Sequence, residues 1–493
     1  MPTYQTLKKL FLFWLLNLVS MAVIAQNQEI TKTLTLPEVI KLALQEAAVA
    51  KQALAQRENS YWEWRTYKAN YKPQLSLSGT LPDFNRAISP VIQPDGTTAF
   101  RQVAINNSSL NLNISQGIGL TGGEVFITSQ VQRFDDFDRK QKSYNSNPAI
   151  IGISQPIRGY NALAWDKKIE PLLYIESQMQ YLEDRETISL LATRYFFDLL
   201  LEQVNASIAA RNMTNNEAIY KIAEEKYRLG KISKNDLLQL QLTVINAKAA
   251  LAQANLGTKT VSLKLCNYIG YTGSEMLELV MPTAVPGLQI EQELALAEAR
   301  KNRKESVAFK RRVLQAEQQL AKAKGENGFQ ASLYATYGLT NQAANFIESY
   351  LQPIDQQKVR VGFDIPILDW GKQRSVHKTA QINQQLTQYT VDQENVAFNQ
   401  AVITQVNQFE MLRNQLLLNT EADNIAQQRY EIAQKTYLIG KISITDLNIA
   451  SNEKDQAKRA YLSSLRDFWE AYYNLRTLTL YDFEKDKPLT LEP

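Results

Sequence analysis

The sequence predicts a mainly α-helical protein with a smaller β portion, in which one structural module occurs twice along the chain. Three observations support this prediction: a helical turn whose residues recur, two very long helical patterns, and short segments whose hydrophobic period changes from about 3.6 to about 2. Each copy of the module is expected to contain a helix, strands, a long helix and a final helix, in that order.

The recurring turn has the same residue types at the same spacing in both copies. Tyr227-Arg-Leu-Gly-Lys-Ile-Ser233 returns as Tyr437-Leu-Ile-Gly-Lys-Ile-Ser443, and an aspartate follows each turn, Asp236 and Asp446. A glycine here is expected at the C′ position, which ends a helix in left-handed geometry. The N-cap candidates for the next helix are Ser233 or Asn235, and Ser443 or Thr445. Two unrelated helical hairpins would not share all these positions, so we infer an internal duplication.

Composition and the first residues narrow the class of protein. The 493 residues carry a formal net charge of +4 without a basic stripe, which argues against a nucleic-acid partner. Lys8 and Lys9 precede a short apolar run, and a small-residue cleavage pattern ends at Ala25, so residues 1–25 are expected to be a signal peptide rather than a membrane anchor. Gln26 follows, and the absence of a cysteine there excludes a lipoprotein attachment site at that place. The single cysteine, Cys266, leaves no intramolecular disulfide.

The first copy is expected over residues 26–270. Helical periodicity runs from 36 to about 71, with Pro37 in the first turn. Alternation of polar and apolar residues then predicts a strand region over 74–157. Its strands are expected at 74–79, 109–115, 124–131 and 149–157, with polar loops over 81–101 and around Asp135, Asp136 and Asp138. No later segment is long and apolar enough for a spanning helix, so strands in a closed barrel are the remaining way for this exported chain to cross a bilayer.

The first copy also contains a glycine-rich segment and a long helical pattern with an internal proline. Gly117, Gly119 and Gly122 satisfy a dinucleotide-binding spacing, but a strand follows them instead of a helix, which favours a hairpin turn. A helix of about 65 residues, roughly 100 Å long, then runs from about 160 to 227, and Pro171 should kink it or mark its start. A final helix is expected over 233–268.

The second copy is expected over residues 291–481, after a linker at 271–290 and before a tail at 482–493. Its strands are expected at 331–337 and 359–367, its long helix at 370–437 and its last helix at 444–478. Leu75 aligns with Leu333, and Pro156 aligns with Pro366. The stretch between the two aligned positions is longer in the first copy, so the first copy contains an insertion, which matches the 109–131 hairpin. The sequence leaves open whether that hairpin adds strands to the barrel or caps it.

Polar residues follow defined lines on both long helices. Arg194, Asp198 and Glu202 form a narrow strip on an otherwise apolar helix, which is typical of a helix wedged between neighbours in a wall. Residues 381–408 are rich in uncharged amides, which suit a solvated face and a water-filled lumen equally. The only histidine, His377, has no His or Cys companions, so a metal site, a cofactor and an enzyme are not expected.

The order of elements, the signal peptide and the paired turns resemble the TolC-type outer-membrane efflux protein family, from about residue 36 to 481. The junctions at Ser154-Gln-Pro-Ile157 and Asp364-Ile-Pro-Ile-Leu-Asp-Trp-Gly371 add to the resemblance. The long first strand region is similar to the Bacteroidetes-like version. The resemblance implies a homotrimer with a helical α-barrel in the periplasm and a shared transmembrane β-barrel in outer-membrane lipid. It also implies a periplasmic adaptor (membrane fusion) protein and an inner-membrane RND or ABC transporter as partners, without nucleic acid.

The resemblance carries roles onto particular residues. It implies that the two turns are adaptor-docking tips, made by Leu229, Gly230, Lys231, Ile439, Gly440 and Lys441. Asp446 corresponds to an acidic pore constriction, and Asp236 and Tyr437 to a latch between tips. Ile449 and Ile442 depart from the family pattern, which puts a second acidic ring and the usual basic latch partner in doubt.

The function that this resemblance implies is a passive exit channel of a tripartite efflux or type I secretion system. A periplasmic coiled-coil scaffold without a pore is the alternative. It accounts for the long helices and the signal peptide, but not for alternating strands at matching places in both copies. Drug efflux and protein secretion are not separated by the sequence.

Overall fold

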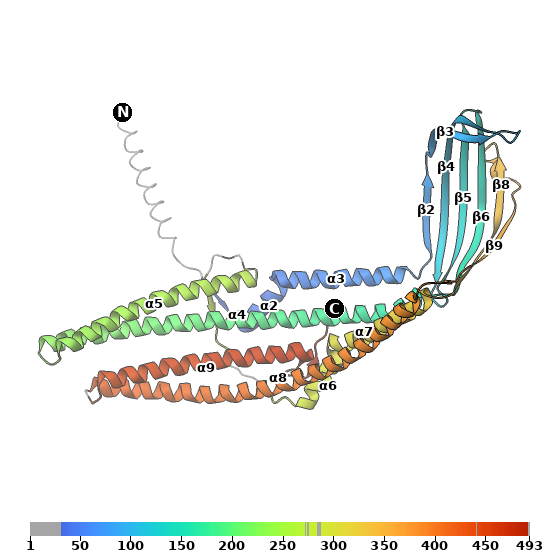
Figure 1. Ribbon diagram of the computed structural model, residues 1–493. Coiled ribbons are helices and arrows are strands. Elements are labelled where there is room, and N and C mark those ends of the chain that lie inside the picture. Colours follow the sequence, from blue (N-terminus) through green and yellow to red (C-terminus); the bar gives the residue numbers. More distant parts are fainter. Residues whose placement is uncertain (1–30, 272, 274–275, 283–286, 440, 492–493) are drawn as a thin grey trace, which may run out of the picture. The chain divides into compact units, whose positions relative to one another are not determined.

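The structure is a computed structural model that describes residues 31–271, 273, 276–282, 287–439 and 441–491 (Figure 1). The predicted signal peptide and Gly440 lie outside these residues. The chain divides into two compact units: the first comprises Met1–Ala55, Tyr181–Arg303 and Asn399–Pro493, and the second comprises Gln56–Gln180 and Lys304–Phe398. Each unit takes segments from both copies, so this division cuts across the predicted repeats.

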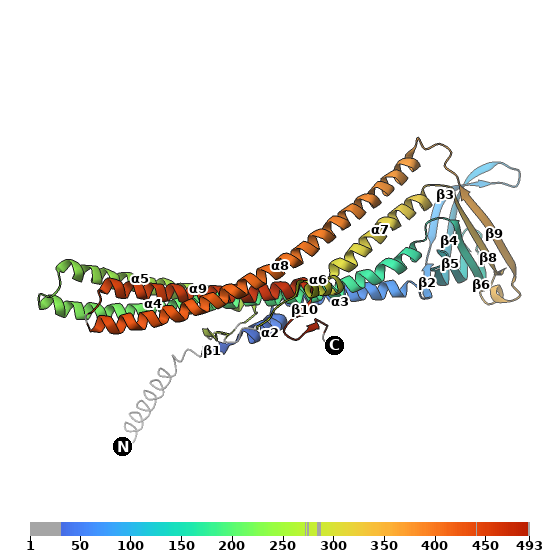
Figure 2. The same ribbon diagram turned by 90° about the horizontal axis from the view of Figure 1, so that it is seen from below.

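The eight α-helices among the described residues follow the predicted order in each copy (Figures 1 and 2). They are α2 (Leu36–Glu46), α3 (Ala48–Ala69), α4 (Ala162–Arg228), α5 (Lys234–Tyr268), α6 (Gln292–Asn302), α7 (Lys304–Glu326), α8 (Lys372–Leu438) and α9 (Ile444–Thr479). The two long helices, α4 and α8, have 67 residues each, which supports the duplication. Pro171 lies inside α4 rather than at its start. No helix in the described ranges has the length and apolar character needed to cross a bilayer.

The first helix of each copy is divided in two, which the sequence analysis did not predict. Ala47 separates α2 from α3 with a ψ of 140°, and Arg303 separates α6 from α7 with a ψ of 147°. Both angles belong to extended backbone, which ends a helix. Because the interruption occurs in both copies, it is a feature of the module.

The second unit contains one antiparallel sheet in the order β2-β4-β5-β6-β8-β9. Its strands are β2 (Gln74–Thr80), β3 (Phe84–Ile92), β4 (Thr98–Ile118), β5 (Gly123–Asp136), β6 (Gln141–Arg158), β8 (Gln330–Ala343) and β9 (Ile354–Asp364). A 3-10 turn, η1 (Glu348–Tyr350), lies between β8 and β9. β3 pairs with the first half of β4, and β2 pairs with the second half, so these two strands follow each other along one edge. The sheet therefore has six positions across its width.

The sheet answers one open question and corrects two predictions. The inserted hairpin becomes β4 and β5, which lie within the sheet between β2 and β6, so it adds strands instead of capping them. The predicted loop at 81–101 is wrong, because it contains β3 and the start of β4. The loop predicted around Asp135, Asp136 and Asp138 is correct only for Asp138, because Asp135 and Asp136 are the last two residues of β5. Asp135 is buried and accepts hydrogen bonds from Arg133 and Asn106. The glycine-rich turn joins β4 to β5 as predicted, with Gly122 at φ +74°.

Short strand pairs lie outside the main sheet, in the first unit. β1 (Thr31–Leu34) pairs in parallel with β7 (Met276–Leu279), so the segment predicted as a linker contains a strand. β10 (Tyr481–Asp482) pairs with β11 (Lys487–Pro488) in the tail.

In the amide-rich part of α8, Asn407 accepts a hydrogen bond from Gln292 at 2.6 Å, and Asn399 accepts one from Arg300 at 3.1 Å. These two amides therefore contact α6.

In the first unit the helices form a wall in the order α5, α4, α9, α8 (Figure 1). α5 lies against α4 through the Lys248–Glu217 ion pair at 3.1 Å, and α8 lies against α9 through Lys458–Asp423 at 3.0 Å. Between residues 186–212 of α4 and 455–476 of α9, polar contacts recur: Glu186–Arg476, Arg194–Glu470, Asp198–Arg466, Asn205–Arg459 and Asn212–Asp455. Residue numbers rise on one helix as they fall on the other, so the two helices are antiparallel. Arg194 and Asp198 of the predicted polar strip thus face α9, whereas the Glu202 carboxylate lies beside Gly257 of α5.

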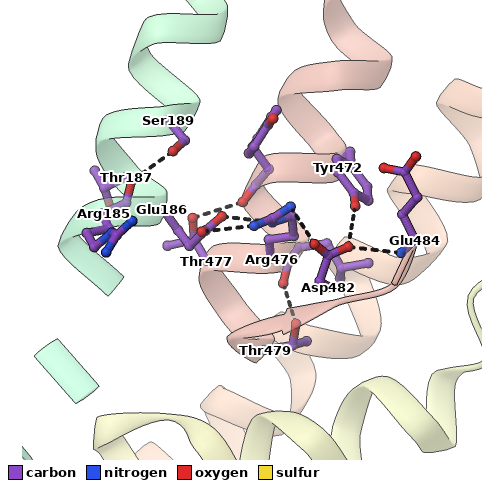
Figure 3. A network of polar contacts seen from close by, with 12 residues as sticks. Arg185, Glu186, Thr187, Ser189, Tyr472, Arg476, Thr477, Thr479, Asp482 and Glu484 are labelled. Carbon is purple, nitrogen blue, oxygen red and sulfur yellow. Dashed lines mark hydrogen bonds and ion pairs between the residues drawn. The ribbon is translucent and has the colours of Figure 1, made fainter. Parts of the chain in front are cut away.

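A buried polar network closes one end of the α4–α9 contact (Figure 3). Arg476 donates to both carboxylate oxygens of Glu186, at 2.8 and 3.0 Å, and to Asp482 at 3.2 Å. Tyr472 donates to the other oxygen of Asp482, at 3.2 Å. The guanidinium also lies over the rings of Tyr472 and Tyr473, and burial raises the pKa of Tyr473 to about 12. This network fixes the C-terminal strand β10 to the first long helix.

Candidate functional site

The first candidate tip is the turn between α4 and α5. Its Gly230 has φ +62°, in the left-handed region that favours glycine. The Lys231 N–H donates to the Lys226 carbonyl at 2.9 Å, and the Gly230 N–H donates to the Tyr227 carbonyl at 2.9 Å. These two bonds define a Schellman motif, which satisfies the last carbonyls of α4. A Cβ added at Gly230 would meet nothing within 4 Å, so the turn projects into open space in the single chain.

The start of α5 is fixed by a reciprocal capping box. The Ser233 hydroxyl accepts from the Asp236 N–H at 3.2 Å, and the Asp236 carboxylate accepts from the Ser233 N–H at 3.1 Å. Ser233, which is one of the two predicted candidates, is therefore the N-cap of α5. The Asp236 carboxylate is committed to its own helix terminus.

The second candidate tip repeats this geometry between α8 and α9. The Lys441 N–H donates to the Thr436 carbonyl at 3.1 Å, the equivalent of the Lys231 bond. Ser443 and Asp446 form the second capping box, with N–H to oxygen distances of 3.1 Å in both directions. The exposed side chains of Leu229 (68%) and Ile439 (67%) occupy equivalent places in the two turns. The two turns therefore carry a matched pair of exposed apolar side chains.

One contact joins the two tips within the chain. The ammonium of Lys226, at the end of α4, lies 5.9 Å from the centre of the Tyr437 ring, near the end of α8. This distance allows a cation–π interaction, which is worth about 0.5–1 kcal/mol at exposed sites. The Tyr437 ring thus lies near the end of α4, while Asp236 bonds to Ser233.

Asp446 is fully exposed in the single chain. The hydrogen bonds from the Ser443 hydroxyl and backbone hold the pKa of its carboxyl below the ordinary value of 3.8. The carboxylate is therefore charged over the physiological range. Its geometry satisfies a capping role by itself, and it also leaves a negative charge exposed beside the second tip.

A polar cluster that the sequence analysis missed lies farther from the tips, between α4, α8 and α9. Asp455 is buried, accepts a hydrogen bond from Asn212 at 2.7 Å, and lies 3.2 Å from the Lys454 ammonium. The Lys454 ammonium also lies 4.1 Å from the centre of the Tyr430 ring, and Asn215 reaches the Tyr430 hydroxyl at 3.4 Å. The paired spacing of Asn212 and Asn215 on α4 was the available signal. These contacts connect the two copies just beyond the tips.

The sheet carries a second candidate surface. The partners Leu75, Ile114, Ile127, Ile151 and Tyr337 form one continuous row across β2, β4, β5, β6 and β8. All five side chains are exposed, although they are apolar or aromatic. The same face continues on β9 with Val359, Val361 and Phe363, which are also exposed.

The opposite face of the same strands is largely polar. Ser76, Asn113 and Thr128 form the adjacent row, and the Thr128 hydroxyl donates to the Asn113 side-chain oxygen at 2.9 Å. Strands that alternate apolar and polar residues, with the apolar side unburied, are typical of a wall between lipid and water. The fold thus presents two surfaces of interest, the paired tips and the two-sided sheet.

His377 is half-buried in α8. No group of three His, Cys, Asp or Glu residues is placed to hold a metal ion within the part of the chain that the structure describes.

Comparisons with known proteins agree with this geometry. Residues 329–479 match the model of a family described as outer membrane efflux protein. No curated protein sequence matches the chain significantly. The solved structures cover more of the chain than residues 329–479, which match the family model.

Several solved structures have a similar fold at low sequence identity. The Campylobacter jejuni CmeC outer membrane channel is 14% identical, with a TM-score of 0.64 over 92% of this chain and 87% of that chain. The open-state Neisseria gonorrhoeae MtrE outer membrane channel is 14% identical, with a TM-score of 0.60 over 90% and 88%. The outer membrane protein VceC of Vibrio cholerae is 14% identical, with a TM-score of 0.56 over 90% and 95%. At these identities the likeness establishes the fold alone. The family model thus matches part of the second copy, and these outer membrane channels share the fold over about nine-tenths of the chain.

Proposed function

We propose that three copies of this chain form the passive outer-membrane exit channel of a tripartite efflux or type I secretion system. The periplasmic part would be the helical wall, and the outer-membrane part would be a barrel to which each chain contributes its sheet. Energy would come from an inner-membrane transporter of the RND or ABC type, which a periplasmic adaptor connects to the tips. The observation that carries the proposal is the unburied apolar face that runs across the whole sheet.

The sheet supports the membrane part of the proposal through its open edges. β2 and β9 end the sheet, and each carries unpaired backbone groups on one side. Exposed edge strands are normally blunted or covered, because they invite pairing with another chain. Within a bilayer every backbone polar group needs a partner, so the edges must be closed by further copies.

The helical wall supports the trimer in the same way. Its two outer helices, α5 and α8, carry exposed apolar side chains at heptad-like spacing. These are Leu238, Leu242, Ile245, Leu256 and Leu263 on α5, and Met411, Leu418, Ile425 and Ile432 on α8. Such stripes are coiled-coil seams that lack a partner in the single chain. A second copy supplies one, because α8 of one copy would run antiparallel to α5 of the next and close a ring.

The tips would form the end that the adaptor docks. Leu229, Gly230 and Lys231 in the first turn, and Ile439, Gly440 and Lys441 in the second, would receive the adaptor's helical hairpins. Docking would separate the tips that Lys226 and Tyr437 hold together. Three copies of Asp446 around the axis would form an acidic constriction that favours cations. Opening would widen this ring.

A conductance measurement and a transport measurement test the proposal together. Purified protein in a planar bilayer should give discrete, cation-preferring channels. A deletion strain of the host should retain more of its pump substrates or secreted protein, and the gene should restore export. If the protein forms channels but its deletion does not change export, the protein is a pore without a role in efflux or secretion. An export phenotype without channels would favour the periplasmic scaffold.

A further inference from the structure

We propose that each chain contributes six strands, so that the barrel of the trimer has eighteen strands. The inference rests on the proposed trimer, and it concerns how wide the exit through the outer membrane is. The matching elements of the two copies are β2 with β8 and β6 with β9, which alone would supply four strands per chain and a barrel of twelve. The inserted β4 and β5 change this count because they occupy the middle of the sheet.

The inserted strands are full members of the wall. β4 pairs with β2 over seven residue pairs and with β5 over fourteen, and β5 continues into β6 with one irregularity near Thr128. Leu112 of β4 and Ile127 of β5 continue the exposed apolar face, and Asn113 and Thr128 continue the polar face. A hairpin that capped the barrel outside the membrane would have no reason to continue both faces.

The edges of the six-stranded sheet fit a second copy of this chain. Each strand is antiparallel to its neighbour, so the first and sixth positions run in opposite directions, and β9 of one copy can pair with β2 of the next as antiparallel strands. Both edges expose apolar residues, with Leu77 at 69% and Val361 at 61%. Pro90 lies in β3 on the same edge as β2 and lacks a backbone donor. The pairing is therefore expected on β2 and not on β3.

A single copy cannot close this sheet on itself. Membrane barrels have about eight or more strands. Three copies give an even, all-antiparallel barrel whose diameter is about 1.5 times that of a twelve-stranded one, because diameter grows roughly linearly with strand number. Barrels of roughly 16–18 strands leave an aqueous channel. The outer-membrane passage would then be wide, and the narrowest point would be at the tips.

Engineered cysteines test the edge pairing in a Cys266→Ser background. One cysteine replaces Leu75 or Leu77 on β2, and the other replaces Val359, Val361 or Phe363 on β9, in full-length protein in native outer membranes. Oxidation should give a ladder that ends at the trimer for at least one combination. Within one chain the two edges are five strand spacings apart, or roughly 24 Å, so an intramolecular bridge is excluded. The matched control pairs β9 with Val125→Cys on β5, which should give no ladder.

Cysteine labelling tests the place of the inserted hairpin independently. Ile127→Cys should react only with a bilayer-soluble maleimide, and Thr128→Cys should react with a water-soluble one. Leu333→Cys and Tyr334→Cys on β8 provide the same comparison in a strand that is not inserted. Two results would overturn the eighteen-stranded barrel: reaction of both β5 cysteines with the water-soluble reagent, or trimers in which no β2–β9 pair crosslinks. Neither result would contradict the proposed channel function. A complete absence of trimers would overturn the proposed function as well.

Discussion

The carboxylate of Glu186 accepts two hydrogen bonds from the guanidinium of Arg476, at 2.8 and 3.0 Å, although 290 positions separate the residues (Figure 3). The pair joins the first long helix to the last helix, and Asp482 extends it into the C-terminal strand. Two carboxylates and one guanidinium thus share a poorly hydrated place. Such a network stabilises the wall only while all its members are present.

Arg476→Met should destabilise the helical part strongly. The substitution leaves the buried carboxylates of Glu186 and Asp482 without their cation, and breaking a buried pair in this way costs about 3–5 kcal/mol. The measurement is thermal unfolding of the detergent-solubilised protein, followed by circular dichroism. Arg459→Met is the matched control, because Arg459 is exposed on the same helix and bonds to the neutral Asn205 of α4. Equal stability of the two variants would refute the assigned role of the network.

Gly230→Leu should abolish export while trimers persist. The left-handed backbone at Gly230 adds a strain of about 1–2 kcal/mol for any L side chain, but open space surrounds the position. The bulky side chain would therefore obstruct adaptor docking rather than folding. Gly96→Leu is the control, because Gly96 also has positive φ and open space but lies between β3 and β4. Normal export in Gly230→Leu cells, with the variant present at the normal level, would remove the docking assignment from this turn.

Asp446→Ala should raise conductance or weaken block by divalent cations. Asp236→Ala removes the same capping box from the other tip and should weaken the start of α5 as Asp446→Ala weakens the start of α9, so it separates capping from pore effects. A conductance that both variants change equally, or that neither changes, would return Asp446 to a purely capping role.

The pH dependence of that block follows from the same carboxylate. Ser443 holds the pKa of Asp446 below 3.8, so the charge and its contribution to stability are fully present above that value. Both should be lost only as pH falls through the lowered pKa. Single-channel recordings between pH 7 and lower values should therefore show block that is constant through mildly acidic conditions. Block that disappears near neutral pH would point to another group.

Ile425→Glu should prevent assembly. Ile425 lies in the exposed apolar stripe of α8, and a carboxylate there would be desolvated against α5 of the next copy. Gln427→Lys also introduces a charge on α8, but it lies beside the stripe and can pair with Glu431. Native gels should show trimers for the control and monomers for Ile425→Glu. Intact trimers of Ile425→Glu would mean that another surface closes the ring.

Local chemistry explains which parts of this protein the sequence could predict. Gly230, Ser233 and Asp236 act within a few residues of one another, so both the turn and its cap followed from spacing. β3 was missed because Pro82 and Pro90 favour a loop locally, whereas its pairing with β4 depends on residues farther along the chain. The partners of the polar strip were also missed. Arg194 and Glu470 are 276 positions apart, and no local pattern specifies which helix the strip faces.

The mass of the protein extracted from outer membranes in mild detergent tests the central claim most directly. The account predicts a stable trimer that is absent from the soluble periplasmic fraction. A water-soluble monomer or dimer in the periplasm would contradict it.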